Sequence, residues 1–288
     1  MSLKKAIASR KFIVTSEAGP PKGTEVSKMI EEAKPLIGRV DAVNVTDLQS
    51  AVMRLGSLVG CYLLKKVGLD PVFQLTCRDR NRLALQSDLL SAAVLGIENI
   101  LVLTGDHPLN GDHPQAKPVY DLDSVQLLEV VRSLQAGKDM AGNRLDGAPK
   151  FCVGAVVNPS ADPLEPELIK MEKKIKAGAE FFQTQAVYDI KKFEEFVKAT
   201  KAYNIPIISG IILLKSANMA RFMNERVAGI YVPDELIKEI DAAGDKPARS
   251  VEIAARLIKQ LKPMCRGVHI MPIGWERFVP KVLDTAGL

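Results

Sequence analysis

Short apolar runs alternate with longer amphipathic stretches along most of this chain. The apolar runs have the length of buried strands, and the stretches between them repeat apolar residues at the spacing of a helix that packs one face on a core. This pattern predicts strands at 11–16, 41–46, 71–76, 99–104, 151–157, 180–185, 206–211 and 266–271. It predicts helices at 24–38, 50–67, 79–95, 122–136, 164–177, 190–203, 215–226, 247–262 and 275–286, with an extra short helix and loop at 228–246.

The alternation of strands and helices predicts the fold class. Repeated strand–helix units imply a parallel sheet. Eight such units within 288 residues predict an α/β fold in which the sheet closes into a (β/α)8 TIM barrel. No Pro-, Gly- or Ser-rich linker divides the chain, so we expect residues 1–288 to form a single domain.

Polar residues gather where these strands end, which is the face on which barrels of this kind bind ligands. Glu17 ends the first strand, and Asp106 follows the fourth strand beside Gly105, where a ligand can approach the backbone. Two acids on one rim suggest a chemical site. The other polar residues expected on this rim are Thr46, Asp47, Thr76, Cys77, Asn158, Gln183, Gln185, Ser209 and His269.

Each of these residues also has a purely structural interpretation. Polar residues at strand ends often cap helices, and His269 on an apolar strand fits a hydrogen-bonded core residue. Lys173 and Lys174 read as the solvated face of a helix. The loop after Asp106 carries a small repeat, Gly-Asp-His-Pro at 105–108 and again at 111–114.

Composition removes several classes of protein. No apolar run approaches the roughly 20 residues of a membrane span, and residues 1–11 show no secretion signal, so we expect a cytoplasmic protein. The net charge of +5 is scattered over helical segments and only 5% of residues are aromatic, which does not favour nucleic-acid binding. The four cysteines form no C-x-x-C pair and fit no common zinc spacing, so we expect reduced thiols and no metal.

Common catalytic motifs are absent from the sequence. There is no Walker A motif and no G-x-G-x-x-G after a strand, which disfavours a nucleotide-binding Rossmann unit. There is no G-x-S-x-G or H-E-x-x-H, so the common hydrolase and metalloprotease classes lack support. The polar rim of the barrel therefore remains the candidate site.

Short motifs at the strand ends, taken in order, resemble the methylenetetrahydrofolate reductase family, whose members are flavoproteins built on a (β/α)8 barrel. The resemblance runs from about residue 11 to residue 288. Its pieces are Ser16-Glu17 followed by Pro20-Pro21-Lys22, Val45-Thr46, Leu75-Thr76-Cys77, Leu103-Thr104-Gly105-Asp106, Lys173-Lys174, Thr184-Gln185 and Gly210-Ile211.

The resemblance implies roles for individual residues. Glu17 is implied to be the general acid toward the folate, Asp106 to lie near both flavin and pterin, and Gln185 to contact the substrates. The positions implied to bind the flavin are Thr46, Thr76, Asp106, Asn158, Lys173 and Lys174, the two lysines through its phosphate.

The reaction that this implies is reduction of 5,10-methylenetetrahydrofolate to 5-methyltetrahydrofolate in one-carbon metabolism, with a hydride from flavin N5. The cofactor is expected to be FAD, with FMN as the alternative. Electrons are expected from NAD(P)H or from a separate partner subunit, and a homo- or hetero-oligomer is expected. The chain departs from the family by having fewer aromatic residues after Glu17 and Gln185, and Asn158 where many members carry His, which leaves the reductant open.

Other functions remain open at this point. A degenerate barrel that serves only as a binding or scaffold subunit has the same fold. So does a barrel methyltransferase that acts on another pterin. A Schiff-base aldolase needs a lysine on a strand end, and the nearest candidate, Lys215, falls at a helix start.

Overall fold

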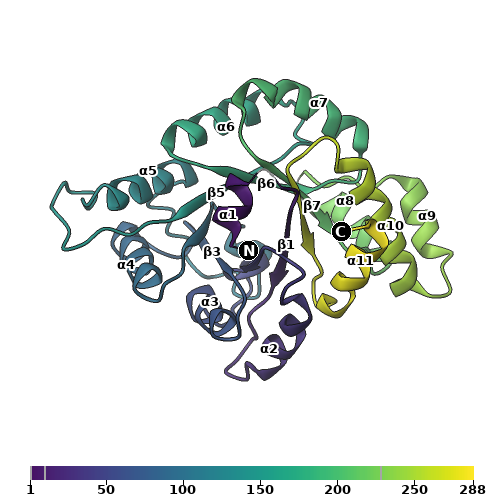
Figure 1. Ribbon diagram of the computed structural model, residues 1–288, viewed down its shortest axis with the longest axis horizontal. Helices are drawn as coiled ribbons and strands as arrows, with labels where there is room; N and C mark the ends of the chain where they lie inside the picture. The colour runs from purple at the N-terminus through teal and green to yellow at the C-terminus, as the bar shows by residue number, and fades with distance from the viewer. Residues whose placement is uncertain (1, 10, 228) are drawn as a thin grey trace.

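Eight parallel strands close into a barrel in a computed structural model that describes residues 2–9, 11–227 and 229–288 (Figure 1). Each strand pairs with the next along the chain, and β8 pairs with β1 to complete the circle. The strands are β1 (Ile13–Ala18), β2 (Ala42–Val45), β3 (Pro71–Thr76), β4 (Asn99–Leu103), β5 (Cys152–Val157), β6 (Phe181–Ala186), β7 (Ile207–Ile212) and β8 (Gly267–Met271). The predicted (β/α)8 barrel is thereby confirmed.

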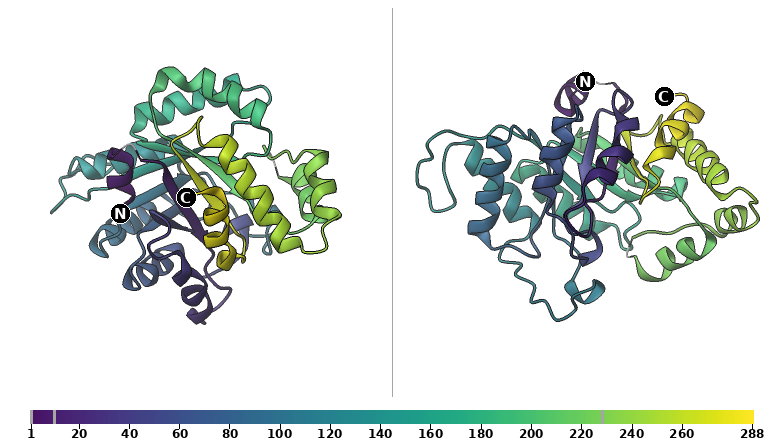
Figure 2. Two further views of the ribbon diagram at one scale, coloured as in Figure 1. Left: turned by 45° about the vertical axis from the view of Figure 1, so that its right-hand side comes forward. Right: turned by 90° about the horizontal axis from the view of Figure 1, so that it is seen from below.

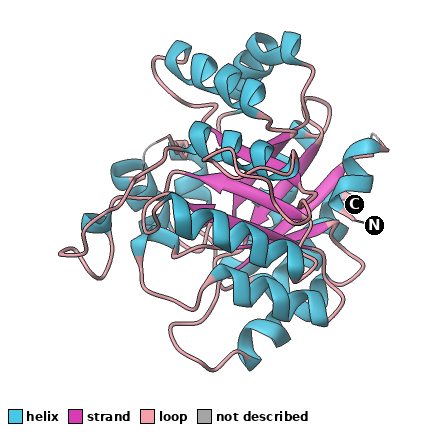
Figure 3. Cartoon of the chain, turned by 90° about the vertical axis from the view of Figure 1, so that its left-hand side faces the viewer, coloured by secondary structure: helices cyan, strands magenta, loops and turns pink. Residues whose placement is uncertain are grey.

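Helices surround the strands on the outside of the barrel (Figure 3). They are α2 (Ser27–Ala33), α3 (Ser57–Lys66), α4 (Arg82–Val94), α5 (Ser124–Gln135), α6 (Glu165–Ala177), α7 (Ile190–Thr200), α8 (Ala217–Arg226), α9 (Asp234–Asp241), α10 (Lys246–Leu261) and α11 (Val279–Ala286). Within the described residues, none of the helices is both long and apolar enough to span a membrane.

Side chains of each strand alternate between the helices and the barrel interior. In β3, Phe73 and Leu75 belong to the large core under the helices, whereas Gln74 and Thr76 line an internal cavity. The same alternation in β1 packs Val14 outward. Because of this two-residue period, polar side chains of the strands face the interior of the barrel, whereas apolar side chains face the helices.

The end of the barrel at which the strands begin is closed by α1 (Leu3–Ala8). The sequence pattern did not predict this helix. Leu3 and Ala6 are buried against strand residues that include Ile13 and Phe181. The backbone N–H of Leu3 also donates to Asp70 Oδ2 at 2.8 Å. The long loop after β4 lies at the other end of the molecule from α1 (Figure 2, right).

Two predicted helices are shorter than the pattern indicated. The segment predicted as 24–38 forms α2 and then a 3₁₀ turn, Lys34–Leu36, because Pro35 has no N–H with which to continue an α-helix. The segment predicted as 50–67 begins its helix only at Ser57, because the backbone before it is left-handed at three non-glycine residues, Leu48, Ser50 and Ala51. In the predicted extra segment 228–246, α9 forms a helix, and residue 228 lies outside the described residues.

Candidate active site

A cavity of about 370 Å³ opens at the C-terminal ends of the strands, a volume within the range of small-molecule sites. We call it the mouth cavity. Leu101 belongs both to its lining and to the apolar cluster under α1, and so marks its floor. Its lining brings together the predicted site residues Glu17, Thr46, Thr76, Asp106, Asn158, Lys174 and Gln185.

Glu17 is a carboxyl group held largely out of water, at 6% exposure. Its Oε1 accepts a hydrogen bond from Gln49 Nε2 at 3.2 Å. Its Oε2 lies 3.8 Å from His269 Nε2, on the other side of the carboxyl group. The predicted acid of the first strand is therefore fixed between two polar side chains and lines a cavity that a substrate can enter.

A polar network fills the barrel beneath Glu17. Thr15 Oγ1 and His269 Nδ1 are 2.9 Å apart, and Gln183 Nε2 donates to Thr15 Oγ1 at 3.4 Å. The amides of Asn44 and Gln183 pair reciprocally, at 2.7 and 3.2 Å. Because these buried polar groups bond one another, the network is rigid and holds His269 in one place.

Asp47 organises the part of the cavity formed by the ends of β2 and β3. Its Oδ2 accepts from the backbone N–H and the hydroxyl of Thr76, both at 2.9 Å. Arg80 donates to both carboxylate oxygens, at 2.8 and 3.1 Å. The hydroxyl proton of Thr76 is thus engaged by Asp47, which leaves the oxygen of Thr76 to accept a bond from a ligand.

Arg78 ties two loops of the cavity together. It is 2% exposed, and its Nη1 donates to the carbonyl oxygen of Asp106 at 3.1 Å while Nη2 donates to that of Leu48 at 3.2 Å. Its charge is balanced by Asp79, whose Oδ2 is 2.7 Å from Nη2. The carboxylate of Asp106 itself is exposed at the cavity rim.

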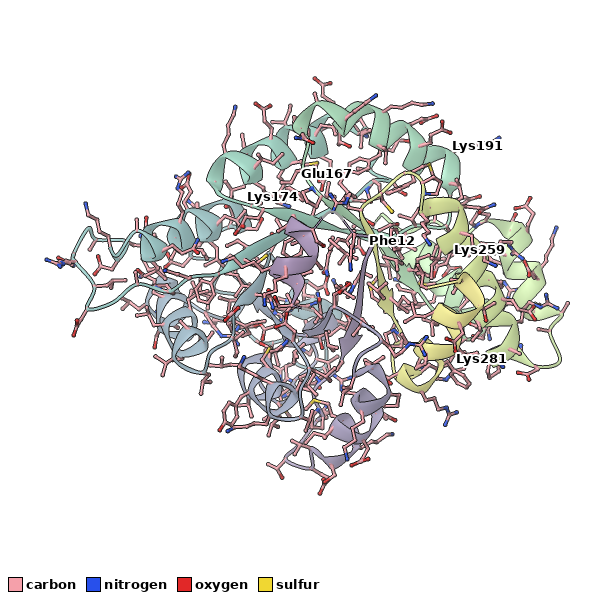
Figure 4. The ribbon with its side chains drawn as sticks, in the orientation of Figure 1. Phe12, Glu167, Lys174, Lys191, Lys259 and Lys281 are labelled. Carbon is pink, nitrogen blue, oxygen red and sulfur yellow. The ribbon has the colours of Figure 1, made fainter. Side chains whose placement is uncertain are left out.

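Lys174 is a buried cation in the cavity wall. It is 3% exposed, on α6, and its Nζ donates to the carbonyl oxygen of Val156 at 2.6 Å. Burial lowers the pKa of Lys174 to about 8. Figure 4 labels it on α6 together with Glu167, which also lines the cavity. Lys173 is exposed and is absent from the lining, so the structure separates these two predicted residues.

Two other residues considered from the sequence do not join the site. Burial raises the pKa of Cys77 to about 12, so this residue is a neutral thiol near pH 7 and a poor nucleophile. Lys215 donates to the carbonyl oxygen of Ile273, with its Nζ 5.3 Å from the centre of the Trp275 ring. Neither side chain belongs to the lining of the mouth cavity.

Sequence reasoning missed Gln49 and Arg78 as site residues. Gln49 lies between the predicted strand 41–46 and the predicted helix 50–67, and Arg78 was counted only as part of the scattered positive charge. The position of Arg78 directly after β3 was the available signal, since strand ends face the mouth of the barrel. Gln49 gave no local signal, because its contact with Glu17 joins the segment after β2 to strand β1.

The residues of the mouth cavity fit a flavin. Thr46 Oγ1 is buried and has no hydrogen-bond partner among the described residues, whereas Thr76 offers an acceptor. The polar edge of a flavin ring system carries both N–H and C=O groups and so matches such a pair. Lys174 supplies a fixed cation of the kind that binds phosphate. The described residues contain no cluster of three or more His, Cys, Asp or Glu side chains arranged to hold a metal ion.

The family model for methylenetetrahydrofolate reductase matches residues 2–287. The chain belongs to this family. Among curated reductases, methylenetetrahydrofolate reductase 2 of Schizosaccharomyces pombe is 29% identical over 258 residues, which cover 80% of this chain and 38% of that protein. The probable methylenetetrahydrofolate reductase (NADPH) of Caenorhabditis elegans is 25% identical over 258 residues, which cover 86% of this chain and 36% of that protein. The chain thus spans less than half the length of these two reductases.

A solved structure shares the fold of this chain. A protein from Clostridium thermocellum described as binding two copies of 5-methyl-5,6,7,8-tetrahydrofolic acid matches with a TM-score of 0.63 and 20% identity, and the match covers 99% of this chain and 97% of that one. At this level of identity the similarity establishes the barrel fold.

Proposed function

We propose that this chain reduces 5,10-methylenetetrahydrofolate to 5-methyltetrahydrofolate with a bound flavin, FAD rather than FMN. One observation carries the proposal: a chain of the reductase family places the carboxyl group of Glu17, 6% exposed, in the wall of its mouth cavity. The 5-methyltetrahydrofolate bound by the Clostridium thermocellum protein supports a folate as the ligand of such a barrel.

The chain's own residues hold and orient the two reactants. When bound, the flavin supplies the hydride that the methylene carbon of the folate accepts. Thr46, Thr76 and Asn158 would bond the polar edge of the cofactor, and Lys174 would neutralise a phosphate. The buried position of Lys174 favours this role because its ammonium group has a single protein partner, the carbonyl oxygen of Val156, among the described hydrogen bonds.

Glu17 has the task of proton transfer. The methylene bridge of the folate opens to an iminium cation when one of its C–N bonds breaks, and a proton delivered to the leaving nitrogen assists that step. Glu17 lines the cavity and is shielded from bulk water, so it is placed to donate to a bound substrate rather than to solvent. General acid catalysis of this kind typically contributes about 10²–10⁴-fold in rate.

Asp106 and Gln185 complete the proposed folate site. Both are exposed at the cavity rim, where the flat pterin ring would enter. The carboxylate of Asp106 is suited to accept N–H bonds from the pterin, and the amide of Gln185 offers both a donor and an acceptor. Arg78 holds the backbone of Asp106 by its carbonyl oxygen and so keeps this carboxylate in place.

Electrons are proposed to come from NAD(P)H or from a separate partner subunit. The Caenorhabditis elegans relative has NADPH in its name, which supports a nicotinamide donor. The region after Glu17 is Ala18-Gly19-Pro20-Pro21 and offers no aromatic ring to stack on a nicotinamide, which favours a partner subunit. Assembly with such a partner belongs to the same proposal.

The test measures the folate half-reaction apart from the physiological electron donor. The flavin-loaded chain is reduced anaerobically with dithionite and mixed with 5,10-methylenetetrahydrofolate while the flavin absorbance is followed. We expect rapid reoxidation by wild type and a loss of about 10²–10⁴-fold in Glu17→Gln, with reduction of its flavin by NAD(P)H or the partner subunit, assayed without folate, largely retained. A loaded wild-type protein that the folate does not reoxidise would contradict the proposal and favour a binding or scaffold subunit.

A further inference from the structure

We infer that Gln49 is a positioning residue for Glu17: its side-chain amide holds one carboxyl oxygen, so that the acid proton is carried by the other. The inference deepens the proposed function and rests on it for the role of Glu17 as the acid. Among the described residues the Glu17 carboxyl group accepts no other hydrogen bond, and His269 Nε2, at 3.8 Å, lies beyond hydrogen-bond distance.

The geometry around Glu17 distinguishes its two oxygens. Oε1 accepts the N–H of Gln49 at 3.2 Å, so a lone pair of this oxygen is already used. Oε2 faces His269 Nε2 at 3.8 Å and has no bond as close. A neutral carboxyl group therefore keeps its proton on Oε2, and the amide of Gln49 prevents the group from turning over.

The backbone around Gln49 is held in a conformation that few side chains adopt unaided. The φ angles of Leu48, Ser50 and Ala51 are 48°, 56° and 57°, all left-handed and none at glycine. Residues in such regions persist only where the surroundings impose them, and they cluster at functional sites. A strained segment that carries Gln49 to the proposed acid fits that pattern.

The contacts that impose this conformation come from Arg78 after β3 and from two neighbouring residues of the 105–120 loop. Arg78 Nη2 donates to the carbonyl oxygen of Leu48 at 3.2 Å. Gly111 packs so closely on Ala51 that an added Cβ would lie 1.9 Å from the Ala51 oxygen. Asp112 Oδ1 accepts from the backbone N–H of Met53 at 3.0 Å.

The repeated Gly-Asp-His-Pro sequence thus has two different uses. In the first copy, Asp106 lines the mouth cavity. In the second copy, Gly111 and Asp112 clamp the 48–53 segment, and Asp112 also pairs with Lys22 from the loop after β1. The second copy therefore acts through Gln49 rather than on a ligand.

The same ionisable groups line the mouth cavity in every residue 49 variant. Besides Glu17 and His269, the charged residues of the lining are Asp47, Arg78, Asp106, Glu167, Lys170 and Lys174. Asp47 is bonded to Arg80, and Arg78 to Asp79, so these pairs are already compensated. If the titration midpoint of Glu17 changes when Gln49 is substituted, the change therefore reports on the contact between Gln49 and Glu17.

The experiment follows the protonation of Glu17 in the full chain by ¹³C NMR of δ-carboxyl-labelled glutamate, with the resonance assigned by its loss in Glu17→Gln. In Gln49→Glu a second carboxylate replaces the amide donor, and two adjacent carboxylates do not readily both ionise. We expect the titration midpoint to move up by about one pH unit or more. Gln49→Leu removes only the donor and should give a smaller upward shift.

A matched control is Gln126→Glu, the same chemical change in the capping box of α5, where Glu serves as well as Gln. It should leave the Glu17 titration unchanged. A midpoint that is the same in wild type, Gln49→Glu and Gln49→Leu would overturn the inference. If Gln49→Glu does not fold, Gln49→Leu alone tests the inference: an upward shift of the Glu17 midpoint supports it, and an unchanged midpoint overturns it.

The folate half-reaction, measured in the same variants, separates this inference from the proposed function. We expect the pH profile of flavin reoxidation by folate to shift with the Glu17 titration, while flavin reduction does not change. If wild type is not reoxidised by folate but the midpoint moves, the contact stands and the proposed function fails. If wild type is reoxidised and neither midpoint nor profile moves, the proposed function stands and the inference fails.

Discussion

The charged side chain of Lys174 is buried, and the folded protein gives its ammonium group only one hydrogen-bond partner. Its ammonium group is 3% exposed and bonds one carbonyl oxygen, that of Val156. Burial disfavours the charged form and lowers the pKa from 10.5 to about 8. Polar groups kept at a cost to stability are commonly found at binding sites, where a ligand supplies the missing partner.

The depressed pKa of Lys174 predicts how stability depends on pH. Between about pH 8 and pH 10.5 the unfolded chain binds more protons at this residue than the folded chain does. The free energy of unfolding should therefore rise with pH across this window, by about 3 kcal/mol in total from this group. The cost is fully present below pH 8. Lys174→Met should remove this rise, as measured by urea unfolding of the flavin-free protein at several pH values.

Lys173→Met is the matched control, since Lys173 is exposed on the same helix. In Lys173→Met the free energy of unfolding should depend on pH as it does in wild type. When the free energies of the two variants are subtracted, the contributions of all other titrating groups cancel. The same pair distinguishes the two lysines as phosphate ligands: flavin titration should show weaker binding only in Lys174→Met. Equal effects of both substitutions would contradict the assignment of this cation to Lys174.

Much of this site was predictable residue by residue, and the exceptions have physical reasons. Thr46, Thr76 and Asn158 follow apolar strands, and the strand period of two places them in the mouth of the barrel. Lys173 and Lys174 were not separated by the sequence analysis, although Met171 and Ala177, three residues before and after Lys174, are buried and share its face of α6. The role of Gln49 could not be predicted from the sequence, because its position depends on contacts with loops that are distant along the chain.

At the scale of elements, the loops after β2 and β4 act as one unit at the mouth of the barrel. Arg78 bonds both of them, and the 105–120 loop packs on the 48–53 segment through Gly111 and Asp112. Neither loop contributes a strand or a long helix. Their shape therefore depends on each other rather than on the barrel core.

This dependence predicts the effect of Gly111→Ala. An added Cβ would meet the Ala51 oxygen at 1.9 Å, so one of the two loops must move and carry Gln49 away from Glu17. We expect flavin reoxidation by folate to slow by up to about 10²-fold. The core is not touched, so the midpoint of thermal unfolding should change little. Stopped-flow and melting measurements on the same sample check both statements.

Gly244→Ala provides the comparison for this substitution. Gly244 is exposed between α9 and α10, and an added Cβ would have open space around it. It should react with folate at the wild-type rate. A Gly111→Ala protein with unchanged folate kinetics would show that the clamp on the 48–53 segment has no bearing on the acid.

Elements with strong periodicity were predicted correctly, and those set by tertiary contacts were not. The strands and α4 to α10 follow the hydrophobic pattern. The α1 helix is only six residues long, too short to be stable alone, and it forms because Leu3 and Ala6 close the base of the barrel. Residues 50–56 were predicted to be helical, yet Ser50 and Ala51 are left-handed, and Val52 and Gly56 are extended.

At the scale of the whole molecule, barrel closure divides the chain into a packed end and a polar end. Eight strand–helix units predicted the closed sheet, and the pairing of β8 with β1 completes it. The strand pattern did not reveal that Thr15, Asn44, Gln183 and His269 would bond one another at mid-height. Such networks arise only when strands far apart in sequence face each other across the barrel.

A single mouth implies that the folate and the electron donor approach the flavin from the same side. The base of the barrel is sealed by α1, and the residues proposed to bind flavin and folate line one cavity. We therefore expect 5-methyltetrahydrofolate to compete with a nicotinamide donor, so that anaerobic flavin reduction slows as this folate is added. The rate should recover when the donor concentration is raised. A rate that the folate does not affect would mean that electrons reach the flavin by another route, as a partner subunit docked outside the mouth would provide.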